Sequence, residues 1–311
     1  MPRIILLLLV AFVPVIGVAE SNAGADVRPV NHEDVFNMRR LGTPVPSPDG
    51  QWTVVQVTEP SYDDEETVSD LWLVAVDGDG EPRRLTASKE SEDGVAWSPD
   101  STRIAFSRMQ GDEEDAVAQV YVMDMTSPGE AQQVTDLATG ASGPKWSPDG
   151  KRFAFESRVY PGAMSNEDNA AEKEAREERD YNVSAYDIFP IRQWNRWRDD
   201  LQTHVFVQDA VPGAEAVDLL AGTEFVAQPG FAGVPSRSGD SLEPEWTPDG
   251  RALVISATMN LDQTAHAEGL YHLYRLADSG GEPEALTSGD EWSCNTAKFS
   301  LDGGSLYCLL E

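Results

Sequence analysis

The chain has 311 residues, of which 54 are acidic and 23 are basic, so its formal net charge is -31. This charge argues against nucleic acid or an anionic membrane surface as a partner. It is typical of a strongly hydrated protein and identifies no substrate.

The N-terminal segment 1–19 has the composition of a secretory signal. It begins with one arginine, is apolar from Ile4 to Val18 and ends in small residues suited to cleavage. The apolar run is interrupted by Pro14 and is short for a membrane anchor. We therefore expect a mature protein that begins at Glu20, is periplasmic or secreted, and inserts into no membrane after the signal is removed.

The next predicted element is a short helix within VNHEDVFNMRRLG, residues 30–42. Asn31 is a suitable N-cap with Asp34 at the N3 position. Val35, Met38 and Leu41 have the spacing of one helical face. This helix would seat the chain at the edge of the domain that follows.

From Val45 onward a hairpin motif recurs, and its turn reads Ser-Pro-Asp-Gly or a close variant. In KWSPDGKRFAFES, residues 145–157, proline presets a dihedral angle of a type I turn and glycine takes the left-handed position that closes it. The turn aspartates recur about every fifty residues, with one longer step: Asp49, Asp100, Asp149, Asp249 and Asp302. A fixed period of this length indicates a repeat architecture.

A second hairpin follows most copies of the first and ends in a Leu/Val-Thr pair, at Thr86, Thr135 and Thr287. Two hairpins per period make a four-stranded antiparallel sheet, which buries both faces only by stacking on its neighbours. The sequence therefore predicts an all-β fold: a truncated β-propeller over residues 20–311 with about four and a half blades, too few to close a ring. The aromatic residues before the turns are expected to pack between blades: Trp97, Trp146, Trp246 and Phe299.

The longer step, between Asp149 and Asp249, has two explanations. Either an extra blade has decayed, or one blade carries insertions. We favour insertion, because 203–220 supplies a second hairpin and 161–202 shows little strand-like alternation. Long insertions in a rigid scaffold often carry function, so the segment 161–202 is the candidate functional region.

The first part of this insertion, 165–187, is rich in alanine, glutamate and arginine and predicts a solvated helix. Lys173 and Glu177 have the i,i+4 spacing of a helical ion pair. The adjacent Glu177 and Glu178 can bind the ammonium group of a substrate, although a charged helical face is the simpler interpretation.

The second part contains IFPIRQWNRWRDD, residues 188–200, which concentrates guanidinium and indole groups. Strand-like alternation predicts Arg192, Trp194 and Arg196 on one face and Trp197 on the other. Such a segment suits a partly exposed surface with cation–π contacts. The pattern leaves open whether these side chains contact a ligand or only pack.

The two cysteines, Cys294 and Cys308, lie in the last hairpin. If the flanking strands pair as expected, the cysteines are nearly opposite each other, and a disulfide is feasible in an oxidising compartment. Free buried thiols are the equal alternative, because the strand register is open by one residue.

The chain carries no recognisable catalytic motif. There is no G-x-S-x-G elbow, no phosphate-binding glycine loop and no Cys/His metal cluster, so we expect no catalytic residue, metal or cofactor. His266 and His272 lack the spacing of a helical metal pair. A bare propeller without an activated nucleophile is expected to hydrolyse nothing by itself.

Together these motifs resemble the N-terminal propeller of the prolyl oligopeptidase (S9) family of serine peptidases, in the branch of acylaminoacyl peptidases and type 5 dipeptidyl peptidases. The resemblance covers essentially the whole mature chain. It rests on EDVFNMRRLGTPVPSPDG, on the repeated W-S-P-D-G hairpins and above all on YDIFPIRQWNRWRDDLQTHVFVQD, residues 186–209. In that branch the last segment usually reads Arg-His-Trp-Asp-x-Trp. This chain matches at Arg192, Trp194 and Trp197 and differs at Gln193 and Asn195.

The resemblance implies a two-domain enzyme in which the propeller caps a C-terminal α/β-hydrolase domain that is absent from this chain. That domain would supply a Ser-Asp-His triad and cleave short peptides at their N-terminal end, by dipeptidyl or acylaminoacyl release. The candidates for lining the substrate channel are Arg192, Trp194, Trp197, Glu177 and Glu178. The alternative is a non-enzymatic, TolB-like interaction propeller of the periplasm.

Overall fold

The computed structural model describes residues 28–62, 67–111, 116–127, 129–181, 183, 186, 190–193, 195–236 and 239–311. The chain divides into two compact units, Met1–Met38 and Arg39–Glu311, and each is considered by itself. The predicted signal 1–19 and its cleavage point lie outside the described residues. Within the described ranges, no helix is both long and apolar enough to cross a bilayer.

The first unit contains helix α1 (His32–Phe36), which begins as predicted. The Asn31 side chain accepts a bond from the Asp34 amide at 3.0 Å, and the Asp34 carboxylate accepts one from the Asn31 amide at 2.9 Å. The prediction of a face shared by Val35, Met38 and Leu41 is wrong, because the helix ends at Phe36 and all three side chains are exposed. Leu41 instead belongs to a strand of the second unit.

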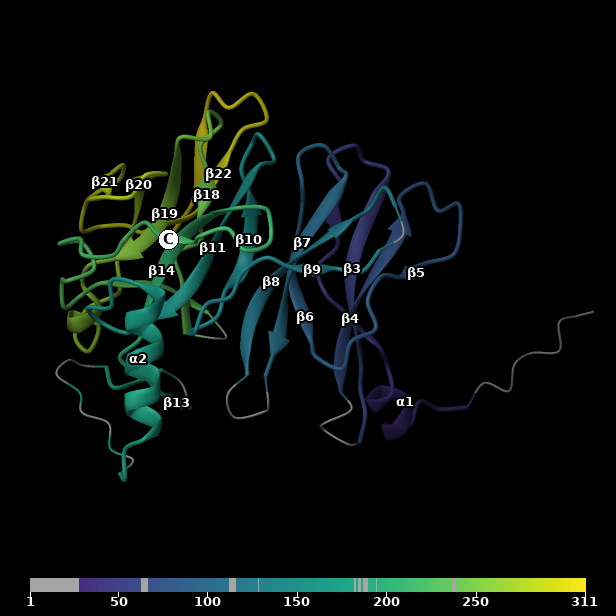
Figure 1. The fold of residues 1–311 in the computed structure, drawn as a ribbon, viewed down its shortest axis with the longest axis horizontal. Coiled ribbons are helices and arrows are strands. Elements are labelled where there is room, and N and C mark those ends of the chain that lie inside the picture. The colour runs from purple at the N-terminus through teal and green to yellow at the C-terminus, as the bar shows by residue number, and fades with distance from the viewer. Residues whose placement is uncertain are drawn as a thin grey trace, which may run out of the picture. The chain divides into compact units, whose positions relative to one another are not determined.

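The second unit is built from antiparallel sheets, which we number as blades in chain order (Figure 1). Blade 1 contains β1 (Arg40–Leu41), β2 (Val45–Pro46), β3 (Trp52–Glu59), β4 (Val68–Ala75) and β5 (Arg83–Arg84). Blade 2 contains β6 (Glu92–Trp97), β7 (Arg103–Gln110), β8 (Val117–Asp124) and β9 (Gln132–Gln133). Blade 3 contains β10 (Ser142–Trp146), β11 (Arg152–Val159), β14 (Gln202–Asp209) and β15 (Val217–Asp218).

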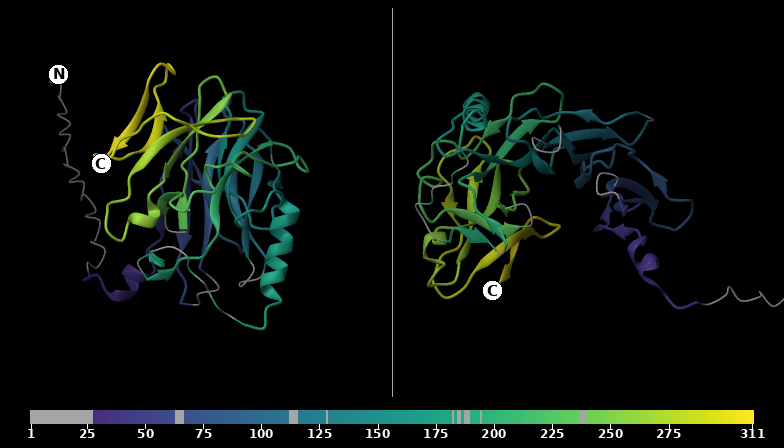
Figure 2. Two further views of the ribbon diagram at one scale, coloured as in Figure 1. Left: turned by 90° about the vertical axis from the view of Figure 1, so that its left-hand side faces the viewer. Right: turned by 90° about the horizontal axis from the view of Figure 1, so that it is seen from below.

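Blade 4 and the last hairpin continue the same series. Blade 4 contains β16 (Ala232–Ser236), β17 (Gly239–Ser241), β18 (Glu245–Trp246), β19 (Ala252–Thr258), β20 (Tyr271–Ala277) and β21 (Glu284–Ala285), with a short 3-10 helix at Leu261–Gln263. The last hairpin pairs β22 (Cys294–Phe299) with β23 (Leu306–Leu310). Blades 2 and 3 are four-stranded and antiparallel, so the predicted all-β fold is confirmed. In Figure 2 the sheets of this unit follow one another in chain order.

The long step between turns reflects an insertion within one blade. Strands β11 and β14 pair along their whole length, with Phe155 opposite Phe206, although the insertion separates them in sequence. The insertion itself forms helix α2 (Asn166–Glu177) and a ribbon of β12 (Arg192–Gln193) and β13 (Arg196–Trp197). The interpretation as an insertion is therefore confirmed, and a decayed blade is excluded.

Each Ser-Pro-Asp-Gly turn is closed by the same set of hydrogen bonds. In blade 3 the Ser147 hydroxyl donates to the Asp149 carboxylate at 2.6 Å, and the Gly150 amide donates to the Ser147 carbonyl at 2.9 Å. The Ser147 hydroxyl and the Lys151 amide lower the pKa of Asp149. The glycine is left-handed, with φ of 68°. In blade 2 Ser101 takes this position with φ of 59°, which costs a non-glycine residue about 1 kcal/mol.

The tryptophan before each turn joins its blade to the preceding one. Its indole N–H donates to a backbone carbonyl of the preceding blade. The accepting residue comes just before the position that corresponds to the tryptophan in that blade. The bonds run from Trp97 to Val45 at 3.0 Å, from Trp146 to Ala96 at 3.1 Å and from Trp246 to Lys145 at 2.8 Å. All three indoles are buried, as predicted. The matching Phe299 has no donor and is only partly buried.

The apolar core lies between blades, as a stacked-sheet fold requires. One cluster combines Val120 of blade 2 with Phe153, Phe155 and Phe206 of blade 3, and the rings of Phe155 and Phe206 stack at 5.5 Å. A second cluster joins blades 3 and 4. Each large apolar side chain buried in this way contributes about 1.5–3 kcal/mol.

The threonines of the Leu/Val-Thr pairs and the two cysteines make further contacts between strands. The hydroxyls of Thr86, Thr135 and Thr287 accept bonds from strand amides in their own sheets at 2.9, 2.8 and 2.9 Å. In the last hairpin a disulfide joins Cys294 to Cys308, whose Cα atoms lie 5.6 Å apart. The hairpin thus has a covalent link between its two strands.

Blades 3 and 4 also share a carboxylate in an unusual environment. Glu156 on β11 accepts bonds from the Ser241 hydroxyl at 2.8 and 3.1 Å and from the Leu242 amide at 2.5 Å. Desolvation raises its pKa to about 7, although these hydrogen bonds oppose the shift. At neutral pH this interface is therefore poised between a charged and a neutral form.

Because the pKa of Glu156 is higher in the folded than in the unfolded state, the folded state holds more protons between the ordinary value of 4.5 and about 7. We expect the free energy of unfolding to fall as the pH rises through that range. Urea unfolding at pH 5 and pH 8 should show a smaller fall for Glu156→Gln than for the unmodified protein. Glu174→Gln on an exposed face of α2 is the control. An unchanged pH dependence in Glu156→Gln would contradict the assignment.

Trp246→Phe keeps an aromatic ring but removes the N–H that reaches the Lys145 carbonyl across the blade interface. We expect a loss of about 1–2 kcal/mol in the free energy of unfolding, because the interface loses a buried hydrogen bond. Trp52→Phe, at an exposed position of β3, should cost much less. Equal urea midpoints for the two variants would show that the indole bond is unimportant.

Candidate functional site

The insertion is held to the blades at the first turn of α2. Ser165 caps the helix by accepting a bond from the Asp168 amide at 3.1 Å. Asn169 is buried and accepts a bond from the Tyr160 amide at 2.9 Å. Asn166 reaches the connection between β9 and β10, where its side chain bonds the Ala138 amide at 2.9 Å and the backbone carbonyl of Asp136 at 3.3 Å. The helix is thus bonded to the connection between blades 2 and 3 as well as to its own blade.

Two consecutive aspartates fix the return of the insertion into β14. Asp200 binds Arg176 of α2 through both carboxylate oxygens, at 2.7 and 2.8 Å, and Asp199 binds Arg158 of β11. The Arg176 guanidinium also lies 4.4 Å from the centre of the Tyr160 ring. The bond from Arg176 lowers the pKa of Asp200. These contacts position the last turn of α2 against blade 3.

The aromatic segment forms a tight ribbon rather than one continuous strand. Arg192 on β12 lies directly opposite Trp197 on β13. Cross-strand partners share a face, so the prediction that these residues lie on opposite faces is wrong. The Arg192 guanidinium is 6.0 Å from the indole centre, and Trp197 is 66% exposed. Trp194 lies outside the described residues.

The two glutamates proposed as ammonium ligands lie at the C-terminal end of α2. The carboxylate oxygen Oε1 of Glu177 lies 3.8 Å from Nζ of Lys173 on the same helix, as the i,i+4 spacing predicted. Glu178 is the C-cap, and both side chains are exposed. Among the described residues, no hydrogen bond or ion pair connects either glutamate to Arg192 or Trp197. The structure thus brings Arg192 and Trp197 together but does not join the glutamates to them.

No group of His, Cys, Asp and Glu suited to a metal ion occurs in the described part of the chain. The nearest arrangement to a catalytic pair is His204 of β14, whose Nδ1 lies 2.8 Å from the carboxylate of Asp218. Both belong to blade 3, and His204 is buried. The pair links β14 to β15 inside the sheet.

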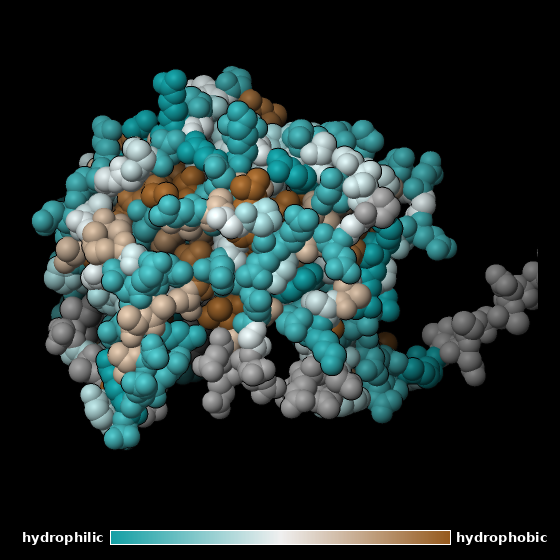
Figure 3. All heavy atoms as spheres, in the orientation of Figure 1, coloured by the Kyte–Doolittle hydropathy of each residue, from teal (hydrophilic) through white to brown (hydrophobic). Residues whose placement is uncertain are grey.

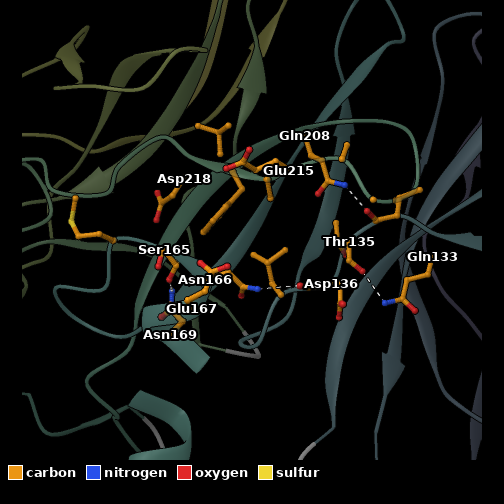
Figure 4. A pocket seen from close by; sticks show the side chains of 18 residues that line it. Gln133, Thr135, Asp136, Ser165, Asn166, Glu167, Asn169, Gln208, Glu215 and Asp218 are labelled. Carbon is orange, nitrogen blue, oxygen red and sulfur yellow. Dashed lines mark hydrogen bonds between the residues drawn. The ribbon is translucent and has the colours of Figure 1, made fainter. Parts of the chain in front are cut away.

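A pocket of ≈ 790 Å³ lies where α2 meets blades 2 and 3 (Figure 4). Its walls come from the residues after β9, from the first turn of α2, from β14 and from the loop before β15. Figure 4 shows Asn166 bonded to Asp136, with Thr135 near Asp136 and Glu167 near Asn166. The volume falls in the range of small-molecule or side-chain binding sites.

No sequence pattern indicates this pocket, because its lining comes from separate segments around 133–137, 164–169 and 206–218. The acidic side chains at its rim come together only in the folded structure. On the face drawn in Figure 3 the surface is mostly hydrophilic, with small apolar areas between polar groups.

Several solved structures are similar to this chain. An acylaminoacyl peptidase from Pyrococcus horikoshii matches 84% of this chain at 15% identity, with a TM-score of 0.53 over 34% of its own length. Prolyl oligopeptidase B from Galerina marginata matches 88% at 14% identity, with a TM-score of 0.51 over 35% of its length. TolB from Acinetobacter baumannii matches 88% at 17% identity, with a TM-score of 0.45 over 47% of its length.

These similarities show a fold like that of the β-propellers of S9 peptidases, at low sequence identity. The chain spans about a third of the length of the two peptidases. No family model matches the sequence. No curated protein matches it either.

Asp200→Asn removes the charge that holds Arg176 and the end of α2. We expect faster amide hydrogen exchange over the last turns of α2, with a loss of about 1 kcal/mol or less because the pair is partly exposed. Exchange read by mass spectrometry should report the change in peptides covering 170–178. The same substitution at the exposed Asp180 is the control. Equal exchange in the two variants would show that Arg176 does not position the helix.

Proposed function

We propose that this chain is the propeller cap of an exported serine peptidase of the prolyl oligopeptidase type. The observation that carries the proposal is the fold similarity to such peptidases, which extends over 84% of the chain with a TM-score of 0.53. The repeated turns and the ribbon sequence that suggested the family belong to that same fold. In this proposal the catalytic triad belongs to a C-terminal hydrolase domain, which is the main partner of the propeller.

The substrates would be short peptides cleaved at their N-terminal end, by dipeptidyl or acylaminoacyl release. A propeller over the active site excludes folded proteins by size. Arg192 and Trp197 suit substrate contact, because the structure pairs them on one face and leaves the indole 66% exposed. Glu178 is the better of the two glutamates for an ammonium group, because Glu177 already lies near Lys173. The proposed periplasmic or secreted location follows from the signal-like segment 1–19.

The test compares this chain with the full product of its gene, using fluorogenic dipeptidyl and acylaminoacyl amides and a fluorophosphonate probe. We expect turnover and labelling only in the longer protein, because the chain has no elbow serine. Labelling of this chain would contradict its assignment as a cap. A full gene product that is inert and unlabelled would favour the TolB-like interaction propeller.

In the active parent, Arg192→Ala and Trp197→Ala should raise KM or lower kcat several-fold without changing the melting temperature. The controls are Arg83→Ala and Trp52→Ala, which alter exposed side chains of blade 1. Unchanged kinetics with a lowered melting temperature would show that the ribbon pair only packs the insertion.

A further inference from the structure

The pocket between blades 2 and 3 has a strongly one-sided charge. Four carboxylates line it and no lysine or arginine does: Asp136, Glu167, Glu215 and Asp218. Asp218 is engaged with His204 and with the amides of Leu220 and Ala221. The other three are exposed, and their carboxylates make no hydrogen bond or ion pair with any described residue.

The amide side chains that line the pocket, in contrast, already form hydrogen bonds within the protein. Each donates its NH₂ group to a backbone carbonyl: Gln133 to Thr135, Asn166 to Asp136, Asn169 to Ser165 and Gln208 to Val134. Figure 4 shows these bonds running along the walls of the pocket. The side-chain groups left free for a ligand are therefore hydrogen-bond acceptors with negative charge.

Most of the remaining lining is apolar, apart from Thr135 and Ser165. Val134 and Leu137 come from the segment after β9, and Phe206 comes from β14. All three are buried, whereas Val217 of β15 is half exposed at the rim. An apolar floor with an acidic rim complements a chain that carries both apolar groups and cations.

The first turn of α2 forms one wall, and its backbone amides place partial positive charge there. Glu167 and Asp168 lie in that turn and oppose this partial charge. The wall therefore does not favour an anion. The four carboxylates therefore set the sign of the pocket, which favours a cationic occupant.

We propose that this pocket binds a basic segment of another polypeptide, in which lysine or arginine side chains flank an apolar one. The apolar side chain would lie over Phe206 and Val134, and the cations would meet Asp136, Glu167 and Glu215. The pocket lies between the outermost strands β9 and β15 of two blades, where a chain can approach from solvent. The proposal does not depend on the peptidase assignment, and its test contains no hydrolysis step.

The probe is a fluorescein-labelled peptide, acetyl-Lys-Leu-Lys-Leu-Lys-amide, followed by fluorescence anisotropy at physiological ionic strength. The test variant combines Asp136→Asn, Glu167→Gln and Glu215→Gln. We expect about tenfold weaker binding by this variant, because each exposed charge contact contributes a fraction of 1 kcal/mol. A control with Glu90→Gln, Glu174→Gln and Glu284→Gln changes the net charge equally at exposed sites outside the lining, and should bind as the unmodified protein does.

Two further peptides separate this site from general attraction to an acidic protein. Replacing the leucines of the probe by serine should weaken binding, because the apolar floor would then be unused, and replacing the lysines by glutamate should abolish it. Equal losses in the test and control variants would overturn the proposal in favour of non-specific charge attraction. Displacement of the probe by spermidine at the same concentration as by unlabelled peptide would also overturn it, because a small cation would then suffice.

Discussion

The hydrogen bond from an indole to the preceding blade is the contact on which the series of sheets depends. A twisted four-stranded sheet with apolar residues on both faces is not stable alone, so its position against a neighbour must be fixed. Trp97, Trp146 and Trp246 fix that position in the same way at successive interfaces, by filling space and by donating a hydrogen bond to a backbone carbonyl of the preceding blade. Arg103 and Arg152 reinforce it, since each lies over the tryptophan of the next blade and donates to the carbonyl of that blade's turn glycine.

Repetition made most of this fold predictable from the sequence. The turn chemistry, the buried tryptophans and the insertion within one blade depend on residues close in sequence or repeated at a fixed spacing. Two local sequence patterns predict the wrong structure. Leu41 fits a helical face but pairs with Val57 in a strand, and Arg192 to Trp197 alternate like a strand but fold back as a ribbon. In both cases hydrogen bonds to another segment overrode the local pattern.

The candidate sites were less predictable, because they depend on contacts between distant segments. The contact of Glu156 with the Ser241 hydroxyl joins residues 85 positions apart, and only the surrounding blades raise the pKa of its carboxyl. The pocket is a similar case, since Asp136, Glu167 and Glu215 stand in separate segments without shared spacing. The aromatic segment, in contrast, is recognisable from the sequence, because its arginines and tryptophans are close together there. Composition identifies such clusters, whereas it cannot identify a surface assembled by folding.

The bonds from Asn166 to the connection between blades 2 and 3 have a consequence for how the domain unfolds. In a series of stacked sheets each unit contacts only its neighbours, and opening one interface can leave the others intact. Helix α2 belongs to blade 3 by chain connection and bonds to the segment that joins this blade to blade 2, so moving these blades apart is expected to strain or break the contacts of the helix as well. We therefore expect the insertion to raise the cooperativity with which blades 2 and 3 unfold.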